Sequence, residues 1–255
     1  MNLRHFGYML YQTTRATYLA QEKNSSLGMI WHLLNPLLMT AVLFLVFSRV
    51  QFLQGIEHYS LFILAGLIHY NFFINATQRS AASFLQSRPL ILNTTVPLEL
   101  LMLRQTSIEG LTLFIEVMLV LALGAFMGVE LGASLLLYPL VFIGTLALSL
   151  GASLFLCSLV VFFSDLNYIW GVFCRLLFFL TPVFFSIDVV PEGFARFILQ
   201  LNPLTQLISV ARETLVYGGH VGMMEVGMAL LGPLLVLVFG VIVFRVSRDR
   251  IADYI

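Results

Sequence analysis

The sequence predicts an all-α integral membrane protein with six transmembrane helices. Of its 255 residues, 60% are hydrophobic and 10% are charged, against roughly 25% charged in a typical soluble domain. The mean hydropathy is +0.96. This hydropathy leads us to expect contact with membrane lipid. Because the formal net charge is zero and Lys23 is the single lysine, we expect no nucleic-acid partner.

Residues 1–28 are predicted to form an amphipathic helix at the membrane interface rather than an additional span. Charges interrupt the segment, and it has neither the continuous apolar core nor the cleavage site of a signal peptide. Several side chains recur at helical spacing, so one face can lie on lipid while the charges stay in water. These side chains are Phe6, Met9, Leu10, Thr13 and Thr17.

Long apolar runs define six predicted spans within one domain of residues 29–255. They cover residues 30–50, 60–77, 101–127, 133–163, 168–185 and 223–244. The third and fourth runs contain 27 and 31 residues. As helices they reach about 40 and 46 Å, so we expect them to project beyond a hydrocarbon core about 30 Å thick.

The distribution of cations predicts that both termini lie in the cytoplasm. Six spans place nine cations on the side of the termini: Arg4, Arg15, Lys23, Arg79, Arg88, Arg104, Arg245, Arg248 and Arg250. The opposite side carries three, Arg49, Arg196 and Arg212. Cytoplasmic loops are enriched in lysine and arginine, so the richer side is the cytoplasmic one.

The segment between the second and third spans, residues 79–97, is predicted to be a cytoplasmic surface helix. It alternates apolar and polar groups and contains Pro89 and Pro97, which stop helices. Such a segment is either an ordinary loop or a docking site for a partner. The projecting helices and the amphipathic N-terminal segment favour the docking site.

Residues 188–218 are predicted to form a re-entrant helical hairpin on the outer side, between the fifth and sixth spans. Prolines and charges interrupt this stretch, so it cannot be a straight span of about 20 apolar residues. Irregular backbone at membrane depth is tolerated where protein covers it or where it lines a wet cavity. We expect its polar residues to hold the two arms of an outer gate together. The candidate gate residues are Pro191, Glu192, Arg196, Asn202, Pro203, Arg212 and Glu213.

The sequence lacks the patterns of an enzyme that hydrolyses ATP or binds a metal. The phosphate-binding pattern GxxxxGK[ST] needs a lysine after glycine, whereas Lys23 follows Glu22. No metal-ligand spacing occurs, and the two cysteines, Cys157 and Cys174, form no CxxC pair. We therefore expect no bound metal and no cofactor on this chain.

An intramembrane enzyme of serine-protease type remains an alternative at this point. Gly151, Ala152 and Ser153 resemble the setting of its serine, and every histidine except His69 sits at the end of a predicted span or outside the spans. Small residues in membrane helices more often mark close helix packing. The alternative requires His69 and Ser153 to lie within hydrogen-bonding distance.

Three charged residues fall deep within predicted spans. Arg175 lies near the middle of the fifth span, while Glu109 and Glu116 share one face of the third. A charge at the bilayer centre costs about 2.5–3.5 kcal/mol on insertion scales, so each needs a partner or water. In one interpretation Arg175 forms an ion pair with Glu109 or Glu116, which would hold the fifth and third spans together. The other places Arg175 on a passage, where its guanidinium binds a substrate phosphate.

Five sequence segments, in the order in which they follow one another along the chain, carry a resemblance to a known family. They are SSLGMIWHLLNPLL (25–38), FILAGL with YNFF (62–73), VFFSDLNYIWGVFCRLLFFLTPVFF (161–185), LNPLTQLISVARETLVYG (201–218) and FRVSRDRIADYI (244–255). Together they resemble the membrane permease of bacterial ABC exporters for cell-surface polysaccharides, the family that exports O-antigen, capsule and teichoic acid. The resemblance covers essentially the whole chain.

This resemblance implies a transporter subunit in the bacterial inner membrane. Two copies would work with two cytoplasmic ATP-binding subunits, which would bind ATP and Mg²⁺, to export a polyprenyl-diphosphate-linked glycan such as O-antigen. A permease for a lipid or drug is the alternative within the same class. The resemblance also implies which residues transmit ATPase motion: Ser83, Phe84, Leu85, Gln86, Arg88, Asp165 and Asn167.

Aromatic residues of the second and fifth spans are further candidates for the substrate path. In similar exporters sugars slide over aromatic faces, although most of the 23 phenylalanines must face lipid. The predicted path consists of Arg175, Glu116, Tyr70, Phe72, Phe73, Trp170, Phe178, Phe179, Phe184 and Phe185.

Overall fold

The computed structural model describes residues 3–23, 30–50, 55–87, 97–163 and 165–254. Within these ranges all regular structure is helical. The long helices are α1 (Leu3–Lys23), α2 (Ile30–Phe47), α3 (Tyr59–Gln86), α5 (Leu98–Phe126), α6 (Tyr138–Val160), α7 (Leu166–Phe179) and α10 (Met223–Tyr254). Shorter elements are η2 (Ala133–Leu137), η3 (Ile187–Val189), α8 (Phe194–Leu201), α9 (Pro203–Arg212) and the π-helical turn η4 (Glu213–Tyr217).

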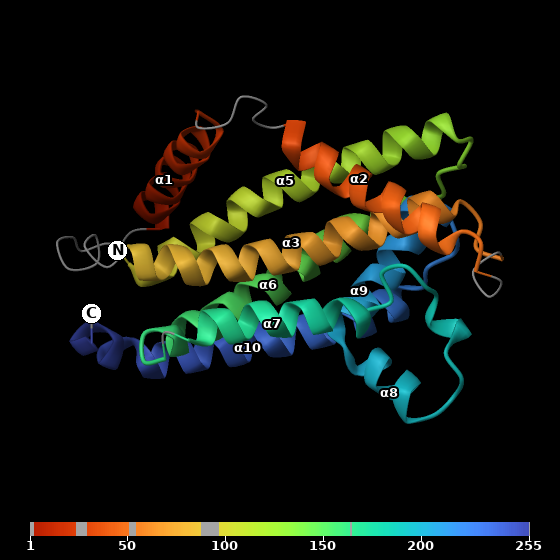
Figure 1. The fold of residues 1–255 in the computed structure, drawn as a ribbon. Helices are drawn as coiled ribbons and strands as arrows, with labels where there is room; N and C mark the ends of the chain where they lie inside the picture. The colour runs from red at the N-terminus through yellow and green to blue at the C-terminus, as the bar shows by residue number, and fades with distance from the viewer. Residues whose placement is uncertain (1–2, 24–29, 51–54, 88–96, 164, 255) are drawn as a thin grey trace.

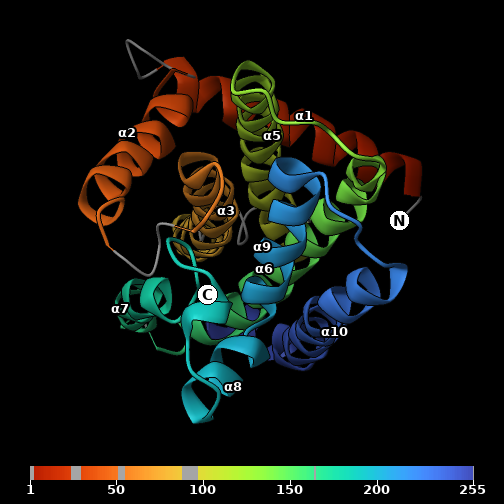
Figure 2. The same cartoon turned by 90° about the vertical axis from the view of Figure 1, so that its right-hand side faces the viewer.

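Helices α2, α3, α5, α6, α7 and α10 form an elongated bundle (Figure 1). Both chain ends lie at one end of the bundle, here called the near end, and η3, α8, α9 and η4 gather at the opposite, far end. We call the segment 187–217 the far hairpin. α1 lies outside the bundle near the end with the termini and runs at a steep angle to its long axis (Figures 1 and 2).

Five helices of the described chain are long and apolar enough to cross a membrane, and they correspond to five of the six predicted spans: α2, α3, α5, α6 with η2, and α10. The chain is therefore a multi-pass membrane protein. The sixth candidate, α7, has only 14 residues. At 1.5 Å per residue it reaches about 21 Å, less than the roughly 30 Å of hydrocarbon.

The predicted fifth span, residues 168–185, was too long at its far end. α7 begins at Leu166 and ends at Phe179, just before the Thr181–Pro182 pair. Proline cannot donate a backbone hydrogen bond and disfavours helical backbone in the residue before it, so the helix stops there. The turn that follows carries Val183 back into the core, where it is fully buried.

The predicted second span was too short at its near end. α3 continues through Arg79 to Gln86, so the first half of the expected surface helix 79–97 belongs to α3 itself. The second half, including Arg88, falls largely in residues 88–96, which lie outside the described chain. Leu98 already begins α5.

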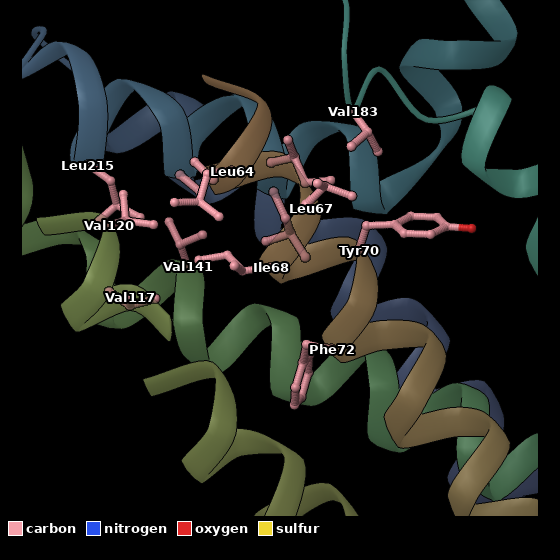
Figure 3. Close-up of a cluster of buried hydrophobic side chains, with 14 of the residues drawn as sticks. Leu64, Leu67, Ile68, Tyr70, Phe72, Val117, Val120, Val141, Val183 and Leu215 are labelled. Atoms are coloured by element: carbon pink, nitrogen blue, oxygen red, sulfur yellow. The ribbon is translucent and has the colours of Figure 1, made fainter. Parts of the chain in front are cut away.

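The buried core is built on α3, and 78% of the most apolar stretch of that helix is buried. Leu64, Leu67 and Ile68 of α3 pack close to Val117 of α5 and Val141 of α6 (Figure 3). The corresponding buried shares of α2 and α10 are only 17% and 22%. The two peripheral helices thus expose apolar surface to the surrounding hydrocarbon.

Two glycines allow α6 and α10 to pack in direct backbone contact. A Cβ placed on Gly240 would overlap the backbone of Gly151, and a Cβ on Gly151 would lie 2.6 Å from the backbone of Leu237. Small residues at such crossings are typical of membrane helices. The Gly151–Ala152–Ser153 sequence therefore serves close packing.

Candidate functional site

The exposed side of α7 carries a charge on an otherwise apolar surface. Arg175 is exposed there, between Val172 at 49% and Phe179 at 66% exposure. Residues spaced three and four apart share one side of a helix. We call this surface the α7 face; it consists of Tyr168, Val172, Arg175, Leu176 and Phe179. Arg175 forms no ion pair within the described chain.

The predicted pairing of Arg175 with Glu109 is wrong. Glu109 accepts a hydrogen bond from Nη1 of Arg79 at 2.9 Å and one from Nε2 of Gln105 at 3.2 Å, so its partners come from α3 and α5. Glu116 is buried in α5, at 6% exposure. Helix α5 lies across α3 from α7 (Figure 2). The α7 helix packs on α3 with Arg175 pointing away from the bundle, so neither glutamate is its partner.

Aromatic rings behind the α7 face form one connected group toward the far end. Phe178 contacts Tyr70 edge-on, with ring centroids 5.2 Å apart, and stacks with Phe184 at 5.9 Å. Phe184 also stacks on Phe47 of α2 at 4.6 Å. The Tyr70 hydroxyl donates to the backbone carbonyl of Cys174, which ties α3 to α7. The Tyr70 hydroxyl therefore holds α7 against α3 one residue before Arg175.

A second aromatic group lies nearer the termini. The Trp170 ring stacks with Phe173 at 5.1 Å and contacts Phe73 at 6.3 Å, and its Nε1 donates to Thr77 Oγ1 at 3.0 Å. Phe72 points away from Tyr70, toward α6 (Figure 3). Seven of the eight predicted aromatic residues therefore belong to these two groups, and Phe72 does not. Tyr70, Phe178, Phe184, Phe185 and, at the exposed edge, Phe179 form the first group, and Phe73 and Trp170 belong to the second.

Arg212 joins the far hairpin to the bundle. Its side chain is buried, at 4% exposure, and donates to three backbone carbonyls: Phe62 from Nε at 3.1 Å, Pro182 from Nη1 at 2.8 Å and Val183 from Nη2 at 2.5 Å. The guanidinium carbon also lies 3.4 Å from the centroid of the Phe62 ring. A planar guanidinium with five donors suits this arrangement. One side chain therefore connects α9, α3 and the turn after α7.

An alanine at Gly66 is expected to destabilise this connection by about 1–3 kcal/mol, as an overpacked core does. Its Cβ would overlap Nη2 of Arg212 and lie 3.0 Å from the Val183 carbonyl oxygen. Gly227→Ala on α10 is the matched control, because a Cβ there meets nothing within 4 Å. Alanine normally stabilises a helix by about 1 kcal/mol over glycine. Thermal unfolding of the purified variants measures the difference, and equal stability of the two would contradict this packing.

Asn202 and Arg196 organise the arms of the far hairpin. Asn202 Oδ1 accepts from Leu204 N at 3.0 Å and caps α9, whose first residue is Pro203, and its Nδ2 donates to Thr181 Oγ1 at 2.9 Å. Arg196 pairs with Asp188 at 3.1 Å. The other predicted gate residues, Pro191, Glu192 and Glu213, are exposed.

The predicted coupling residues differ in accessibility at the near end. Phe84 is buried at 1% exposure and packs in a second core cluster, and Ser83 Oγ accepts from Nη2 of Arg104 at 2.8 Å. Three other predicted coupling residues, Leu85, Gln86 and Asp165, are exposed, and Asn167 is half-buried. Among the predicted coupling residues that the structure describes, Leu85, Gln86 and Asp165 are thus the most accessible to a partner.

His69 and Ser153 have other hydrogen-bond partners. The Nδ1 of His69 lies 2.8 Å from the carbonyl of Ala65, its Nε2 lies 3.2 Å from the Tyr138 hydroxyl, and Ser153 Oγ donates to the carbonyl of Ala76 at 3.5 Å. The condition for the protease alternative is not met. Within the described residues no group of three or more histidine, cysteine or acidic side chains could hold a metal.

The sequence argument missed two residues that hold this region together. Phe47 ends α2 against Phe184, and the Tyr59 hydroxyl donates to the Phe184 carbonyl at 2.8 Å. Both lie at the far ends of their helices, where aromatic residues are common at membrane interfaces. Their position near the membrane interface could have identified Phe47 and Tyr59 as candidates from the sequence. It could not have shown that both contact Phe184.

Comparison with known proteins gives consistent matches. The family model for ABC-2 type transporters matches residues 9–216. Two proteins of Klebsiella pneumoniae, each named O-antigen export system permease protein RfbA, are 26% identical over 253 residues, which is 99% of this chain and 96% of the relative. A protein of the same name from Myxococcus xanthus is 27% identical over 238 residues, or 92% of this chain and 91% of the relative. The similarity runs along nearly the full length of each protein.

Proposed function

Because this chain belongs to the ABC-2 type transporter family, we propose that it is the permease subunit of an ATP-driven exporter for a polyprenyl-diphosphate-linked glycan, most simply O-antigen. Two copies form the conduit in the bacterial inner membrane, and two cytoplasmic subunits bind ATP and Mg²⁺. The full-length similarity to proteins named as O-antigen export permeases supports the choice of substrate.

The observation that carries this proposal is the exposed Arg175 on the apolar α7 face. An arginine facing lipid near the bilayer centre costs about 2.5–3.5 kcal/mol, and the described chain offers it no acidic partner. A water-filled passage closed by a second copy removes this cost. In such a passage the guanidinium can bind the substrate diphosphate, whose oxygens match its paired donors.

The near end is the cytoplasmic side in this proposal. The excess of cations in the segments at this end supports that orientation. α1 lies along the interface, and α7 completes the sixth span together with the turn that follows it. The exposed residues Leu85, Gln86 and Asp165 receive the motion of the ATP-binding subunits. The far hairpin is then a re-entrant gate at the outer mouth, and Arg212 fixes its base.

Reconstitution tests the proposed function directly. Liposomes that contain this permease and its ATP-binding partner should move a polyprenyl-diphosphate-linked glycan across the bilayer only when ATP is hydrolysed. A Walker-lysine variant of the partner is the control without hydrolysis. Transport of a free phospholipid with equal efficiency, and none of the glycan, would contradict glycan export and favour a lipid permease.

A further inference from the structure

One side of α3 carries carboxamide side chains at membrane depth. Asn71, Asn75 and Gln78 are spaced four and three residues apart, so they lie on the same side of the helix. We call these three residues the amide stripe. All three are half-buried, so their side chains are accessible from outside the chain. Asn71 and Asn75 lie about 18 and 24 Å from the start of α3, near the middle of a 28-residue helix about 42 Å long.

The two asparagines of the stripe lack hydrogen-bond partners. Neither the Asn71 nor the Asn75 side chain forms a hydrogen bond with the residues that the structure describes. The neighbouring Thr77 does have a partner, since it accepts from Trp170 Nε1 at 3.0 Å. An unpaired polar side chain is costly in hydrocarbon, where no water replaces the missing partner. The asparagines therefore need hydrogen-bonding groups from outside the described chain.

The amide stripe lies on the side of α3 that the other helices cover least. Arg79, on one side of the stripe, pairs with Glu109 of α5, and Tyr70, on the other side, donates to α7. The remaining neighbour, α2, packs on α3 at Tyr59 but diverges from it toward Ile30 (Figure 1). Figure 2 shows the same arrangement along the bundle, with α3 between α2 and α7.

The stripe adjoins the side of α7 that carries Arg175. A Cβ on Gly171 of α7 would lie 3.9 Å from Nε2 of Gln78, so the two helices meet at these residues. Arg175 follows Gly171 by four residues and lies on the same side of α7, one turn closer to the far end. α3 runs in the opposite direction (Figure 1), so one turn from Gln78 toward the far end reaches Asn75. Arg175 and Asn75 thus lie at the same level on adjoining sides of neighbouring helices.

Carboxamide groups suit the hydroxyl groups of a sugar. Each carboxamide has two N–H donors and a carbonyl acceptor, and a hydroxyl group both donates and accepts. The stripe is also uncharged, so it neither repels a diphosphate nor competes with Arg175 for it. A neutral row of donors and acceptors beside a single cation therefore matches a molecule that joins a sugar chain to a diphosphate.

We propose that the amide stripe binds the hydroxyl groups of the sugars next to the diphosphate that Arg175 meets. This inference rests on the proposed function and identifies the residues that recognise the sugar part of the substrate. Asn71 and Asn75 lie about 6 Å apart along the helix axis, so neighbouring hydroxyls of the glycan reach both. Gln78 continues the same row of hydrogen-bonding groups toward the near end.

A second copy of the chain is the competing partner for the asparagines. Asparagine side chains also form hydrogen bonds across helix interfaces in membranes. A dry contact between two copies at this level would bury the adjoining Arg175 as well, and a buried charge needs an acidic partner. Neither α3 nor α7 contains an aspartate or a glutamate. This favours a hydrated, substrate-binding surface over a contact between copies.

Transport of two matched probes tests this inference. Both are undecaprenyl diphosphates that carry a neutral hexasaccharide with a fluorophore on its last sugar. In one probe the sugar hydroxyls are free, and in the other they are methyl ethers, which cannot donate. External dithionite shows on which side of the bilayer the fluorophore lies in liposomes with the permease, its ATP-binding partner and ATP. The unmodified chain should move the hydroxylated probe roughly tenfold faster. Movement of neither probe would contradict the proposed function itself, whereas equal rates for both would overturn this inference alone.

Variants then locate the discrimination. Asn71→Leu combined with Asn75→Leu should slow the hydroxylated probe roughly tenfold and leave the methylated probe unchanged. Glutamine at both positions keeps the amides and should retain most of the preference. Ile74→Leu is the control, because Ile74 is half-buried at the same level and has no polar group. If the double variant does not fold, Asn75→Leu alone supplies the same test.

Two results with the leucine variant would contradict the proposal. One is an unchanged rate for the hydroxylated probe or an equal loss for both probes, because the amides would then not distinguish sugar hydroxyls. The other is dissociation of the dimer, measured by crosslinking, because it would assign Asn71 and Asn75 to the contact between copies.

Discussion

Replacing Arg212 with methionine is expected to release the far hairpin from the bundle and to abolish transport. The carbonyls of Pro182 and Val183 lie outside any helix and receive their hydrogen bonds from this guanidinium. Each buried acceptor left without a donor costs about 1–3 kcal/mol, so the variant should lose at least about 2 kcal/mol of stability. Thermal unfolding of the purified protein measures the loss, and protease cleavage within 187–217 measures release of the hairpin.

Two other variants separate this role from a simple loss of charge. Arg212→Lys keeps the charge but cannot reach three carbonyls in a planar arrangement, so we expect about half of the loss. Arg196→Met removes a partly exposed ion pair to Asp188, whose side chain is 78% exposed, and such pairs contribute about 0–1 kcal/mol. If Arg212→Met and Arg196→Met had the same stability, Arg212 would not be the connection described here.

Replacing Arg175 with glutamate is expected to lower glycan export at least about tenfold without destabilising the fold. Because Arg175 is exposed on α7, its substitution removes no ion pair with the residues that the structure describes, and surface changes usually stay within about 0.5 kcal/mol. The reversed charge instead repels the substrate diphosphate at a point where it must pass. Export by liposomes with the ATP-binding partner gives the rate, and unfolding temperature gives the stability. Arg175→Lys should retain part of the activity, since it keeps the charge but loses the paired donors.

The ion pair between Arg79 and Glu109 provides the matched control for this experiment. Exchanging the two charges, as Arg79→Glu with Glu109→Arg, should restore much of the stability that either single change removes. The corresponding exchange of Arg175 and Glu109 should restore nothing. If that second exchange did recover export, Arg175 and Glu109 would form a pair in the working transporter.

Much of the fold could be predicted because apolar run length is a strong signal in membranes. A stretch of about 20 apolar residues has almost no alternative to a helix in hydrocarbon, so five spans were recovered within a few residues at most of their ends. The larger errors lie where local composition is ambiguous. The stretch from Arg79 to Gln86 was assigned to a separate surface helix, yet it continues α3, and its Phe84 packs into a core cluster.

The candidate site was predictable in its members but not in its contacts. Arg175 stood out because a charge within an apolar run is costly, and the structure leaves it on an exposed face. Its pairing with Glu109 could not be judged from depth alone, because depth does not say which helices are neighbours. In the same way, the sequence indicated that Arg212 needs a partner but could not show that its partners are backbone carbonyls.

The central claim is that the α7 face lines water between two copies of this chain rather than facing lipid. Single cysteines at Val172 and Leu176 of that face, and at Leu235 of α10, can be placed in a background that lacks the two buried native cysteines. With the ATP-binding partner present in native membranes, a charged thiol reagent measures the exposure of each site to water. Leu235 is the most exposed of the three at 69%, against 49% for Val172 and 58% for Leu176, so exposure alone would favour its labelling. The account predicts labelling at positions 172 and 176 and none at 235, whereas equal protection of all three would contradict it.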